Sequence, residues 1–267
     1  MSPLHGLVLF VFLLLLSAAS AQVSGSWLRN EMTGCYVWNT NPELGKTFNW
    51  SGDCQNNVAQ GRGVLQWYVN GMPNGRYVGE YDDGRMSGRG VFEYRNGDRY
   101  DGEFRDDKPN GHGTLSSVNG ARYTGLFLDG RPARGEATTG GGKSYEGMFR
   151  DGRPARGEVT YPDGSVYNGE LVDDARSGRG VLEYENGDRY EGDFRNDQFR
   201  GWGVFTTAGG DRYEGEFDDD RPNGFGTYTA AHGGIYAGLW TNGCFRQGSR
   251  VAAVLATLKE CGFKSSP

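Results

Sequence analysis

Few residues of this 267-residue chain have the types and spacing that catalysis needs. Beyond residue 21 the chain has two histidines, His112 and His232, and neither has a Ser or Cys at the spacing of a nucleophilic triad. The stretch Gly140–Ser144 resembles a phosphate-binding loop, but it leads into a strand-like sequence instead of a helix, which predicts a turn. We therefore expect no enzyme activity, no catalytic residue and no cofactor.

Acidic residues are abundant and repetitive. Asp218-Asp219-Asp220 and the Asp-Asp pairs that begin at positions 82, 106 and 173 lack the spaced ligands and the closing Glu of a calcium loop. They predict solvated loops without a bound metal. Pairs of carboxylates also catalyse the hydrolysis of glycosidic bonds. An active site would need carboxylates that differ from those of the other copies, and the acidic residues here recur from copy to copy. A polysaccharide hydrolase is therefore the weakest alternative.

The amino-terminal segment has the pattern of an export signal. An apolar run from Leu7 to Leu16 is followed by small residues that end at Ala21, before Gln22. This pattern is typical of a cleaved signal peptide, and the run is shorter than the ~20 residues of a membrane span. Residues 1–21 contain no Lys or Arg, so a retained anchor stays as the alternative. We expect a periplasmic or extracellular protein.

The formal net charge of −6 does not change on cleavage, because residues 1–21 contain no charged side chains. An acidic chain is a poor electrostatic partner for nucleic acid, so we expect no nucleic-acid binding.

A repeat of 22 or 23 residues organises most of the chain. Each copy has Tyr or Trp, then Gly two residues later, and in most copies another large apolar residue four residues later. A Gly-x-Gly follows in most copies, and such regularity indicates one structural unit stacked many times. The copies begin at Trp50, Tyr77, Tyr100, Tyr123, Tyr145, Tyr167, Tyr190, Tyr213 and Tyr236.

The repeating unit reads as a β-hairpin. In residues 180–194 two strand-like segments flank Asn186-Gly187, which predicts a two-residue type I′ turn. Tyr190, Gly192 and Phe194 then share one face of the return strand. We expect a ring of the adjacent copy to fill the gap that Gly192 leaves.

These residues resemble the MORN repeat (membrane occupation and recognition nexus) over about residues 48–248. The resemblance implies an all-β fold, an elongated single-layer antiparallel sheet of consecutive hairpins, with the repeat aromatic rings lining a groove. Family members act as scaffolds, dimerisation modules or membrane-associated tethers, and their enzymatic members carry a separate catalytic domain. Here residues 22–47 and 249–267 are too short for a kinase or SET domain.

Two copies, which begin at Tyr123 and Tyr145, are one residue short, and we expect the missing residue in the connecting loop. These copies carry a central group of basic residues, Arg131, Arg134, Arg150, Arg153 and Arg156. Arginine side chains suit an anionic lipid, a polyanion or an acidic partner. Alternatively, nearby acidic residues such as Asp151 offset the charge and the two copies reflect a duplication.

The four cysteines, with no Cys-x-x-Cys pair, favour disulfides over zinc in an exported chain. A row of eight hairpins spans about 75 Å, whereas a disulfide needs Cα atoms within about 7 Å. We therefore expect Cys35 to pair with Cys54 in an amino-terminal cap, and Cys244 with Cys261.

The tail contains apolar residues at helical intervals, Val251, Val254, Leu255 and Leu258. It predicts a short helix within residues 249–267 that covers the last hairpin, or alternatively docks a partner.

The leading functional hypothesis is an exported, non-enzymatic scaffold that binds an unidentified protein or a second copy of itself through its sheet surface. A lipid or polyanion tether that uses the five arginines is the first alternative. A glycan-binding module, with the hydrolase as its least favoured form, is the second alternative.

Overall fold

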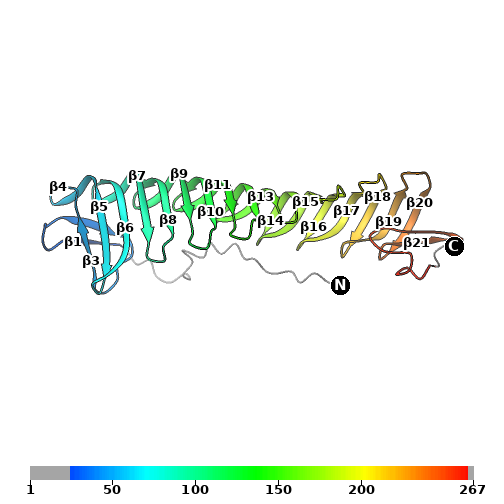
Figure 1. Cartoon of the computed structure of the whole chain (residues 1–267), viewed down its shortest axis with the longest axis horizontal. Helices are drawn as coiled ribbons and strands as arrows, with labels where there is room; N and C mark the ends of the chain where they lie inside the picture. Colours follow the sequence, from blue (N-terminus) through cyan, green and yellow to red (C-terminus); the bar gives the residue numbers. More distant parts are fainter. Residues whose placement is uncertain (1–24, 264–267) are drawn as a thin grey trace. The chain divides into compact units, whose positions relative to one another are not determined.

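The structure is a computed structural model that describes residues 25–263. The predicted signal peptide, residues 1–21, lies outside the described residues. Between residues 25 and 263 the regular elements are 22 β-strands in one open sheet of consecutive hairpins, with no helix (Figure 1). The predicted all-β hairpin fold is confirmed.

The chain divides into two compact units. Among the described residues, the first consists of residues 25–140 and 149–152, and the second of residues 141–148 and 153–263. Strand β12 (Ser144–Arg150) contributes residues to both. The division falls inside the stretch 48–248 that the repeat pattern marks as one array.

The first unit contains a small amino-terminal sheet and the first repeats. Its strands are β1 (Ser26–Arg29), β2 (Tyr36–Asn39), β3 (Lys46–Trp50), β4 (Asp53–Gln55), β5 (Val58–Val69), β6 (Met72–Asp82), β7 (Arg85–Tyr94), β8 (Arg99–Arg105), β9 (Lys108–Ser116), β10 (Arg122–Leu128) and β11 (Arg131–Thr138). Antiparallel pairing joins β5 through β11 in chain order, and β2 adds one parallel bridge to β5.

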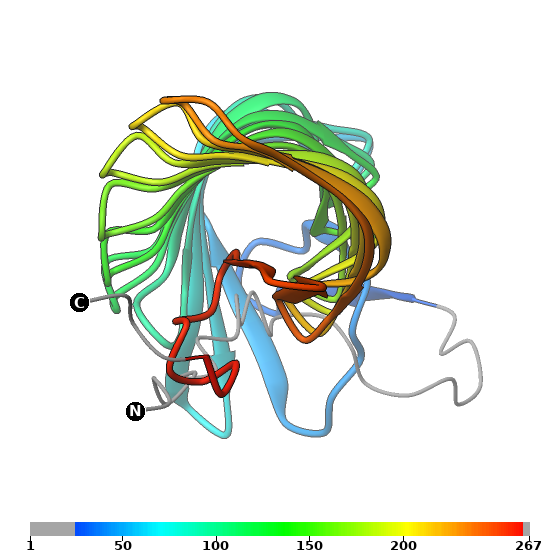
Figure 2. The ribbon, with the colours of Figure 1, turned by 90° about the vertical axis from the view of Figure 1, so that its right-hand side faces the viewer.

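The second unit continues the hairpins and ends in two short strands. Its strands are β13 (Arg153–Thr160), β14 (Val166–Val172), β15 (Ala175–Glu183), β16 (Arg189–Arg195), β17 (Gln198–Thr206), β18 (Arg212–Asp218), β19 (Arg221–Thr229), β20 (Ile235–Thr241), β21 (Cys244–Gln247) and β22 (Arg250–Ala253). Figure 2 shows that these hairpins are curved rather than flat.

Glycines of neighbouring strands lie directly opposite one another in both units. In the second unit Gly180 faces Gly192, and Gly192 faces Gly203 on the next strand. The same pairing joins Gly203 with Gly215 and Gly215 with Gly226. The glycines of Tyr-x-Gly and Gly-x-Gly therefore form a row without side chains across the sheet.

The tyrosine ring of each copy lies over this row. A Cβ added at Gly192 or at Gly203 would lie 2.5 Å from the Tyr190 hydroxyl oxygen. The gap above Gly192 is thus filled by the tyrosine of its own copy. The expectation that a ring of the adjacent copy fills it was wrong, because the Tyr190 ring leans forward along its own strand, where its hydroxyl donates to the Asp193 carbonyl.

Rings of adjacent copies contact each other edge to face instead. Phe194 packs edge-on against Tyr190 and against Tyr167 of the preceding copy, both with ring centroids 5.1 Å apart. In the first unit Phe127 contacts Tyr123 and Tyr100 in the same way, both at 4.9 Å. Each such pair contributes about 0.5–1.5 kcal/mol beyond burial, so aromatic contacts join successive copies.

The two hairpin ends use different turns. At Asn186-Gly187 the positive φ is found at Gly187 (φ 87) and not at Asn186. Tyr184 accepts a hydrogen bond from Gly187 N–H at 2.9 Å, which indicates a type I turn followed by a left-handed glycine. The type I′ prediction was wrong at this site, because a three-residue loop needs only one left-handed residue.

Type I′ turns occur at the opposite ends of the hairpins. Asn196 (φ 50) and Asp197 (φ 68) are both left-handed, as are Asp106 (φ 51) and Asp107 (φ 65). Asn and Asp tolerate this conformation. The Asp-Asp pairs at 106–107, 173–174 and 219–220 are therefore turn residues of the fold, whereas Asp82 ends β6 and the turn there uses Asp83 and Gly84.

The second turn residue also docks on the preceding copy. Asp197 accepts the Arg176 N–H at 2.9 Å, and Asp220 accepts the Phe199 N–H at 2.7 Å. Pro109 and Pro222 occupy this position in two other copies and have no N–H to donate. In these two copies the second turn residue is glycine, Gly130 or Gly243, and its N–H donates to the proline carbonyl at 2.8 Å.

The predicted carboxy-terminal helix is absent from residues 249–263. Arg250–Ala253 is strand β22, paired with β21, and Leu255 has a left-handed φ of 54° that interrupts any helix. Residues 257–262 form a single turn, in which Glu260 accepts the Thr257 N–H at 2.7 Å. Pairing of the strand backbone with β21 satisfies hydrogen bonds that a helix would have made internally.

Candidate binding surface

The repeat tyrosines form the core of the sheet and do not line a groove. Eight of the nine predicted groove rings are at most 7% exposed, and Tyr236 is half-buried. The buried rings are Trp50, Tyr77, Tyr100, Tyr123, Tyr145, Tyr167, Tyr190 and Tyr213. The predicted groove was wrong for these eight residues, because the glycine row lets each ring lie flat on the backbone.

The tyrosine hydroxyls are also satisfied internally. Tyr190 donates to the carbonyl of Asp193 at 3.0 Å, and Tyr167 donates to that of Glu170 at 2.8 Å. Burial raises the pKa of Tyr190 and of Tyr167 above the usual value. Both hydroxyls therefore stay protonated near neutral pH and act as structural donors.

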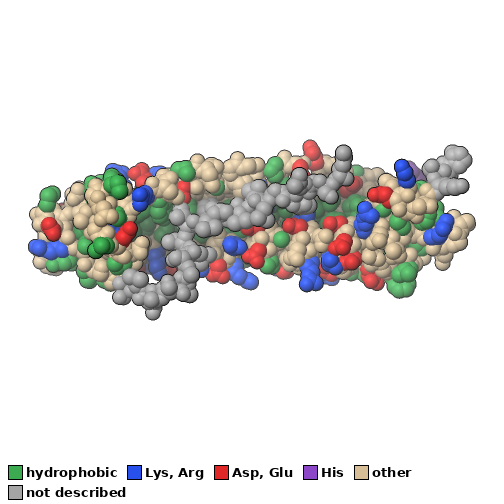
Figure 3. Space-filling model, turned by 90° about the horizontal axis from the view of Figure 1, so that it is seen from below, with side chains coloured by type: hydrophobic (Ala, Val, Ile, Leu, Met, Phe, Trp, Pro, Cys, Tyr) green, Lys and Arg blue, Asp and Glu red, His purple; other side chains and the backbone are tan. Residues whose placement is uncertain are grey.

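The opposite face, here called the outer face, is solvated and carries most of the variation between copies. Arginines that precede the repeat tyrosines pair with acidic neighbours, as in Arg99–Asp101 at 2.8 Å and Arg189–Glu191 at 2.7 Å. These side chains are 40–57% exposed, and such pairs contribute at most about 1 kcal/mol. On the side of the molecule seen in Figure 3, acidic and basic side chains are likewise interspersed.

The residue missing from the short copies is lost from a strand and not from the connecting loop. The Asp129-Gly130 turn keeps two residues, but between Phe127 and Gly125 the pairing with β11 passes over one extra residue, Ala133. In a full-length copy two residues, Gly201 and Trp202, are passed over at the equivalent bulge, and Gly201 is left-handed (φ 64). The shorter bulge needs no left-handed residue, so Ala replaces Gly.

The predicted arginine group is distributed over both units. Arg131 pairs with Asp151 at 2.9 Å, and Arg153 pairs with Asp173 at 2.8 Å. All four side chains are at least half exposed. Acidic residues therefore offset these two arginines, as the alternative interpretation expects.

The other three arginines of this group are exposed strand residues. Arg134 on β11 lies opposite Leu126, and Arg156 on β13 lies opposite Glu170. Arg150 is the last residue of β12.

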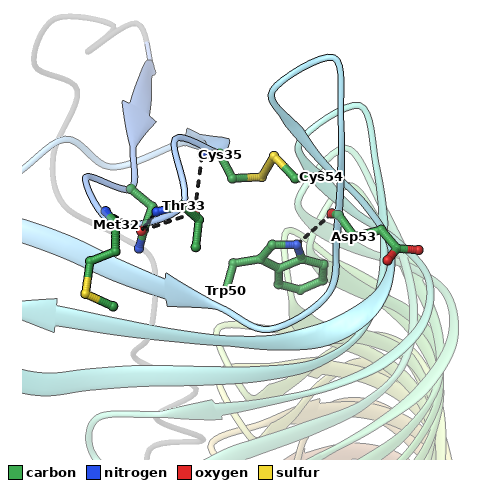
Figure 4. The surroundings of a disulfide bond; sticks show 7 residues. Met32, Thr33, Cys35, Trp50, Asp53 and Cys54 are labelled. Carbon is green, nitrogen blue, oxygen red and sulfur yellow. Dashed lines mark hydrogen bonds between the residues drawn. A yellow bond between two sulfur atoms is a disulfide. The ribbon is translucent and has the colours of Figure 1, made fainter.

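Both predicted disulfides are present. Cys35 and Cys54 have Cα atoms 5.8 Å apart and join the loop before β2 to β4 (Figure 4). Beside this bond the Trp50 indole donates to the Asp53 carbonyl at 2.9 Å. Cys244 and Cys261 have Cα atoms 5.6 Å apart and tie the tail to β21. No cysteine in residues 25–263 is free.

An exposed apolar patch lies on the outer face of β17–β20. Trp202 is 51% exposed, Phe225 is 65% exposed and Leu239 is 61% exposed. Phe225 and Leu239 lie directly opposite each other, and Trp202 lies opposite Glu216. A shallow depression of about 320 Å³ is lined by Trp202, Glu214, Phe225, Gly226, Thr227 and Gly238.

Sequence reasoning missed this patch, although a signal for it was present. The middle residue of Gly-x-Gly is Arg89 or Arg179 in other copies and changes to Trp202 and Phe225 in two successive copies. Folding does not require a large apolar side chain in place of a charged one at a position that faces solvent.

The remaining candidate groups are not assembled into a site. His112 lies on β9 and His232 in the loop before β20. Across residues 25–263 no group of three or more His, Cys, Asp or Glu side chains could hold a metal ion. In the same part of the chain no helix is long and apolar enough to cross a membrane.

One titratable group stands apart. Burial raises the pKa of Asp107 to about 6, although its carboxylate accepts the Met86 N–H at 2.8 Å and lies 3.6 Å from Arg85. The group serves the turn between β8 and β9.

These features define an all-β repeat protein built from stacked hairpins with a tyrosine-and-glycine core. The chain belongs to the MORN-repeat family. The family model matches residues 51–72, 77–99, 100–122, 145–166, 167–189, 190–212 and 213–234. Residues 123–144, between two matched segments, contain the hairpin of β10 and β11 with the same glycine pairing.

Solved structures with a similar strand arrangement are distant. A mutant of the TCP10 domain of Danio rerio CPAP is 16% identical, with 70% of this chain and 91% of that chain covered and a TM-score of 0.37. The TCP domain of Drosophila melanogaster SAS-4, in complex with a proline-rich motif of Ana2, is 12% identical, with 83% and 94% covered and a TM-score of 0.31. At these values neither likeness supports a function for this chain. No curated protein matches it.

Proposed function

We propose that this protein is an exported, non-enzymatic scaffold that binds partner proteins through the outer face of its hairpins. The observation that carries this proposal is the contrast between the two faces of one repeat. The inner ring position is Tyr in copy after copy, whereas the exposed middle residue of Gly-x-Gly is Arg89, His112, Arg179, Trp202 or Phe225. A constant core with a variable surface is the arrangement of repeat proteins that bind other proteins.

The two disulfides are consistent with an oxidising, exported compartment. The absence of a catalytic site in this proposal rests on the sequence: neither histidine has a nucleophile partner, and the carboxylates are repetitive.

Crosslinking in the native envelope tests the proposal. The exported protein, crosslinked in place and purified, should carry the same few proteins in independent preparations. The comparison protein is a variant with Arg in place of Trp202, Phe225 and Leu239. Its fold should be kept, because the buried tyrosine core is unchanged. It should lose the partners that bind the outer face of β17–β20. Recovery of only abundant bystanders, with no difference between the two proteins, would contradict the proposal.

The enzyme alternative is tested separately. The mature protein is incubated with an unbiased glycan array, and bound glycans are analysed for cleavage products. The proposal expects no turnover. Product formation that replacement of an acidic outer-face residue abolishes would make the protein a hydrolase.

An anionic lipid or polyanion is the partner in the tether alternative. It has less support, because Arg131 and Arg153 are each paired with an acidic residue. Heparin or anionic-vesicle binding that disappears when all five arginines of the group are replaced would favour it over the protein scaffold.

A further inference from the structure

The depression on the outer face of β17–β20 carries a specific inference that rests on the proposed function. It starts from the middle position of Gly-x-Gly, which faces solvent opposite an acidic residue of the next strand. Arg89 lies opposite Glu103, and Arg179 lies opposite Asp193 with 3.6 Å between the charged groups. In these copies the chain supplies both the cation and the anion.

On β17 the cation is replaced and the anion is kept. Trp202 occupies the arginine position, and Glu216 still lies opposite it on β18. Among residues 25–263 no ion pair involves Glu216, and its carboxylate accepts one long hydrogen bond, from Phe225 N–H at 3.4 Å. An exposed carboxylate therefore stands beside an exposed indole without a cation from its own chain.

The neighbouring pair completes a site with two rings. Phe225 on β19 replaces a second arginine, and Leu239 on β20 stands where an acid would face it. The carboxylates of Glu214 and Glu216 on β18 lie between the strands of Trp202 and Phe225. Glu214 also lines the depression, and its carboxylate forms an ion pair with Arg212 at 2.6 Å.

This combination has a definite ligand chemistry. Ring faces of Trp and Phe attract cations, arginine more often than lysine. A planar guanidinium stacks on aromatic rings and binds carboxylates through paired hydrogen bonds. The acidic chain, with a formal net charge of −6, favours a basic partner.

We propose that the depression lined by Trp202, Glu214 and Phe225 is a docking site for an arginine side chain on an extended segment of a partner protein. The guanidinium stacks on Trp202 and pairs with Glu216, and it thereby supplies the cation that Arg179 supplies to Asp193 one copy earlier. An apolar residue next to the arginine packs on Phe225 and Leu239.

The test uses the full mature chain and a labelled peptide of sequence Gly-Ser-Arg-Leu-Arg-Ser-Gly. The matched peptide has citrulline at both arginine positions, which keeps the shape and removes the charge. Fluorescence anisotropy should show saturable binding of the arginine peptide, at least tenfold weaker binding of the citrulline peptide, and a loss of affinity as salt is raised.

Three variants locate the site. Trp202→Arg with Phe225→Arg restores the residue type that other copies already carry, so the fold should be kept, and binding should fall at least tenfold. Glu216→Gln should weaken binding about fivefold, because one charge-assisted contact is lost. Val172→Arg makes the same kind of change at an exposed apolar residue outside the depression and should leave binding unchanged.

Several outcomes would overturn the inference. They are no saturable binding up to about 1 mM peptide, equal binding of the citrulline peptide, or unchanged binding by the double arginine variant. Sedimentation that shows a dimer which the double variant disrupts would assign the patch to a second copy instead. If the peptide fails but the envelope crosslinking still recovers specific partners, the scaffold proposal stands without this site.

Discussion

The ring of Tyr190 lies across Gly203, a residue of the neighbouring strand, so closely that a Cβ on Gly203 would be 2.5 Å from the tyrosine hydroxyl oxygen. The same Gly203 lies opposite Gly192, which the ring also covers. The tyrosine thus needs a glycine on its own strand and a second glycine on the next strand. This requirement explains why Tyr-x-Gly and Gly-x-Gly occur together in most copies.

Replacing Gly203 with alanine should therefore destabilise the second unit by about 2–3 kcal/mol, because a buried ring must move to admit one methyl group. Gly209→Ala is the matched control, since its nearest neighbour is the Thr207 hydroxyl at 3.7 Å. Thermal unfolding followed by circular dichroism measures both. Equal melting temperatures for the two variants would contradict close packing of the Tyr190 ring on Gly203.

The turn carboxylates that bind the preceding copy give a second prediction. Asp197→Gly keeps a residue suited to the left-handed turn but removes the acceptor for the Arg176 N–H and the ion pair at 3.0 Å. This substitution should lower the free energy of unfolding by about 1–2 kcal/mol. Asp197→Asn keeps an acceptor and should cost less. Hydrogen exchange should increase around residues 175–200 in the glycine variant; an unchanged exchange pattern there would show that this bond does not join the copies.

Asp107 gives a prediction about pH. Its pKa is about 6 in the folded protein and about 3.9 in an unfolded chain, so the folded state favours the protonated form. The protein should gain stability as pH falls from about 6 to about 4, and this contribution of about 1–3 kcal/mol should be absent above pH 6.

Asp107→Asn should raise the melting temperature at pH 7.5 and flatten its change between pH 4 and 6. The amide keeps an acceptor for the Met86 N–H and removes a charge that burial penalises. The exposed neighbour Asp106, also left-handed, provides the control Asp106→Asn. A lower melting temperature for Asp107→Asn at pH 7.5 would mean that attraction to Arg85 outweighs burial.

The carboxy-terminal disulfide should limit fraying of the last strands. Replacing both Cys244 and Cys261 with serine opens a loop with a sequence separation of 17 residues, which should cost about 3 kcal/mol. Hydrogen exchange should rise in β20–β22 and stay unchanged in β13–β16, because each copy contacts only its neighbours. Uniform loss of protection across the second unit would instead indicate a single cooperative domain.

Much of the fold follows from local sequence patterns. The spacing of Tyr and Gly predicts the hairpins, because alternation along a strand is a property of the backbone. The two cysteine pairs were also predictable, since a row of hairpins was expected to be too long for a disulfide between its ends. The five arginines could be recognised from the sequence of the two short copies. The ion pairs of Arg131 with Asp151 and of Arg153 with Asp173 depend on contacts between successive copies.

The candidate site was only partly predictable. The tyrosines were expected to line a groove, and they are core residues. The arginine positions that became Trp202 and Phe225 could have been noticed by aligning the copies. Glu216 can be recognised as part of the site only from the strand register, which places it opposite Trp202.

The sequence by itself determined the repeating hairpin, the number of residues in each copy and the cysteine partners, because each depends on local periodicity or on chain connectivity. Tertiary structure decided which turn is type I′, where the short copies lose a residue, whether the tail is helix or strand, and which face the tyrosines occupy. Those features depend on how one strand pairs with the next. A bulge of one or two residues changes which side chains meet, and that pairing is set by packing between copies.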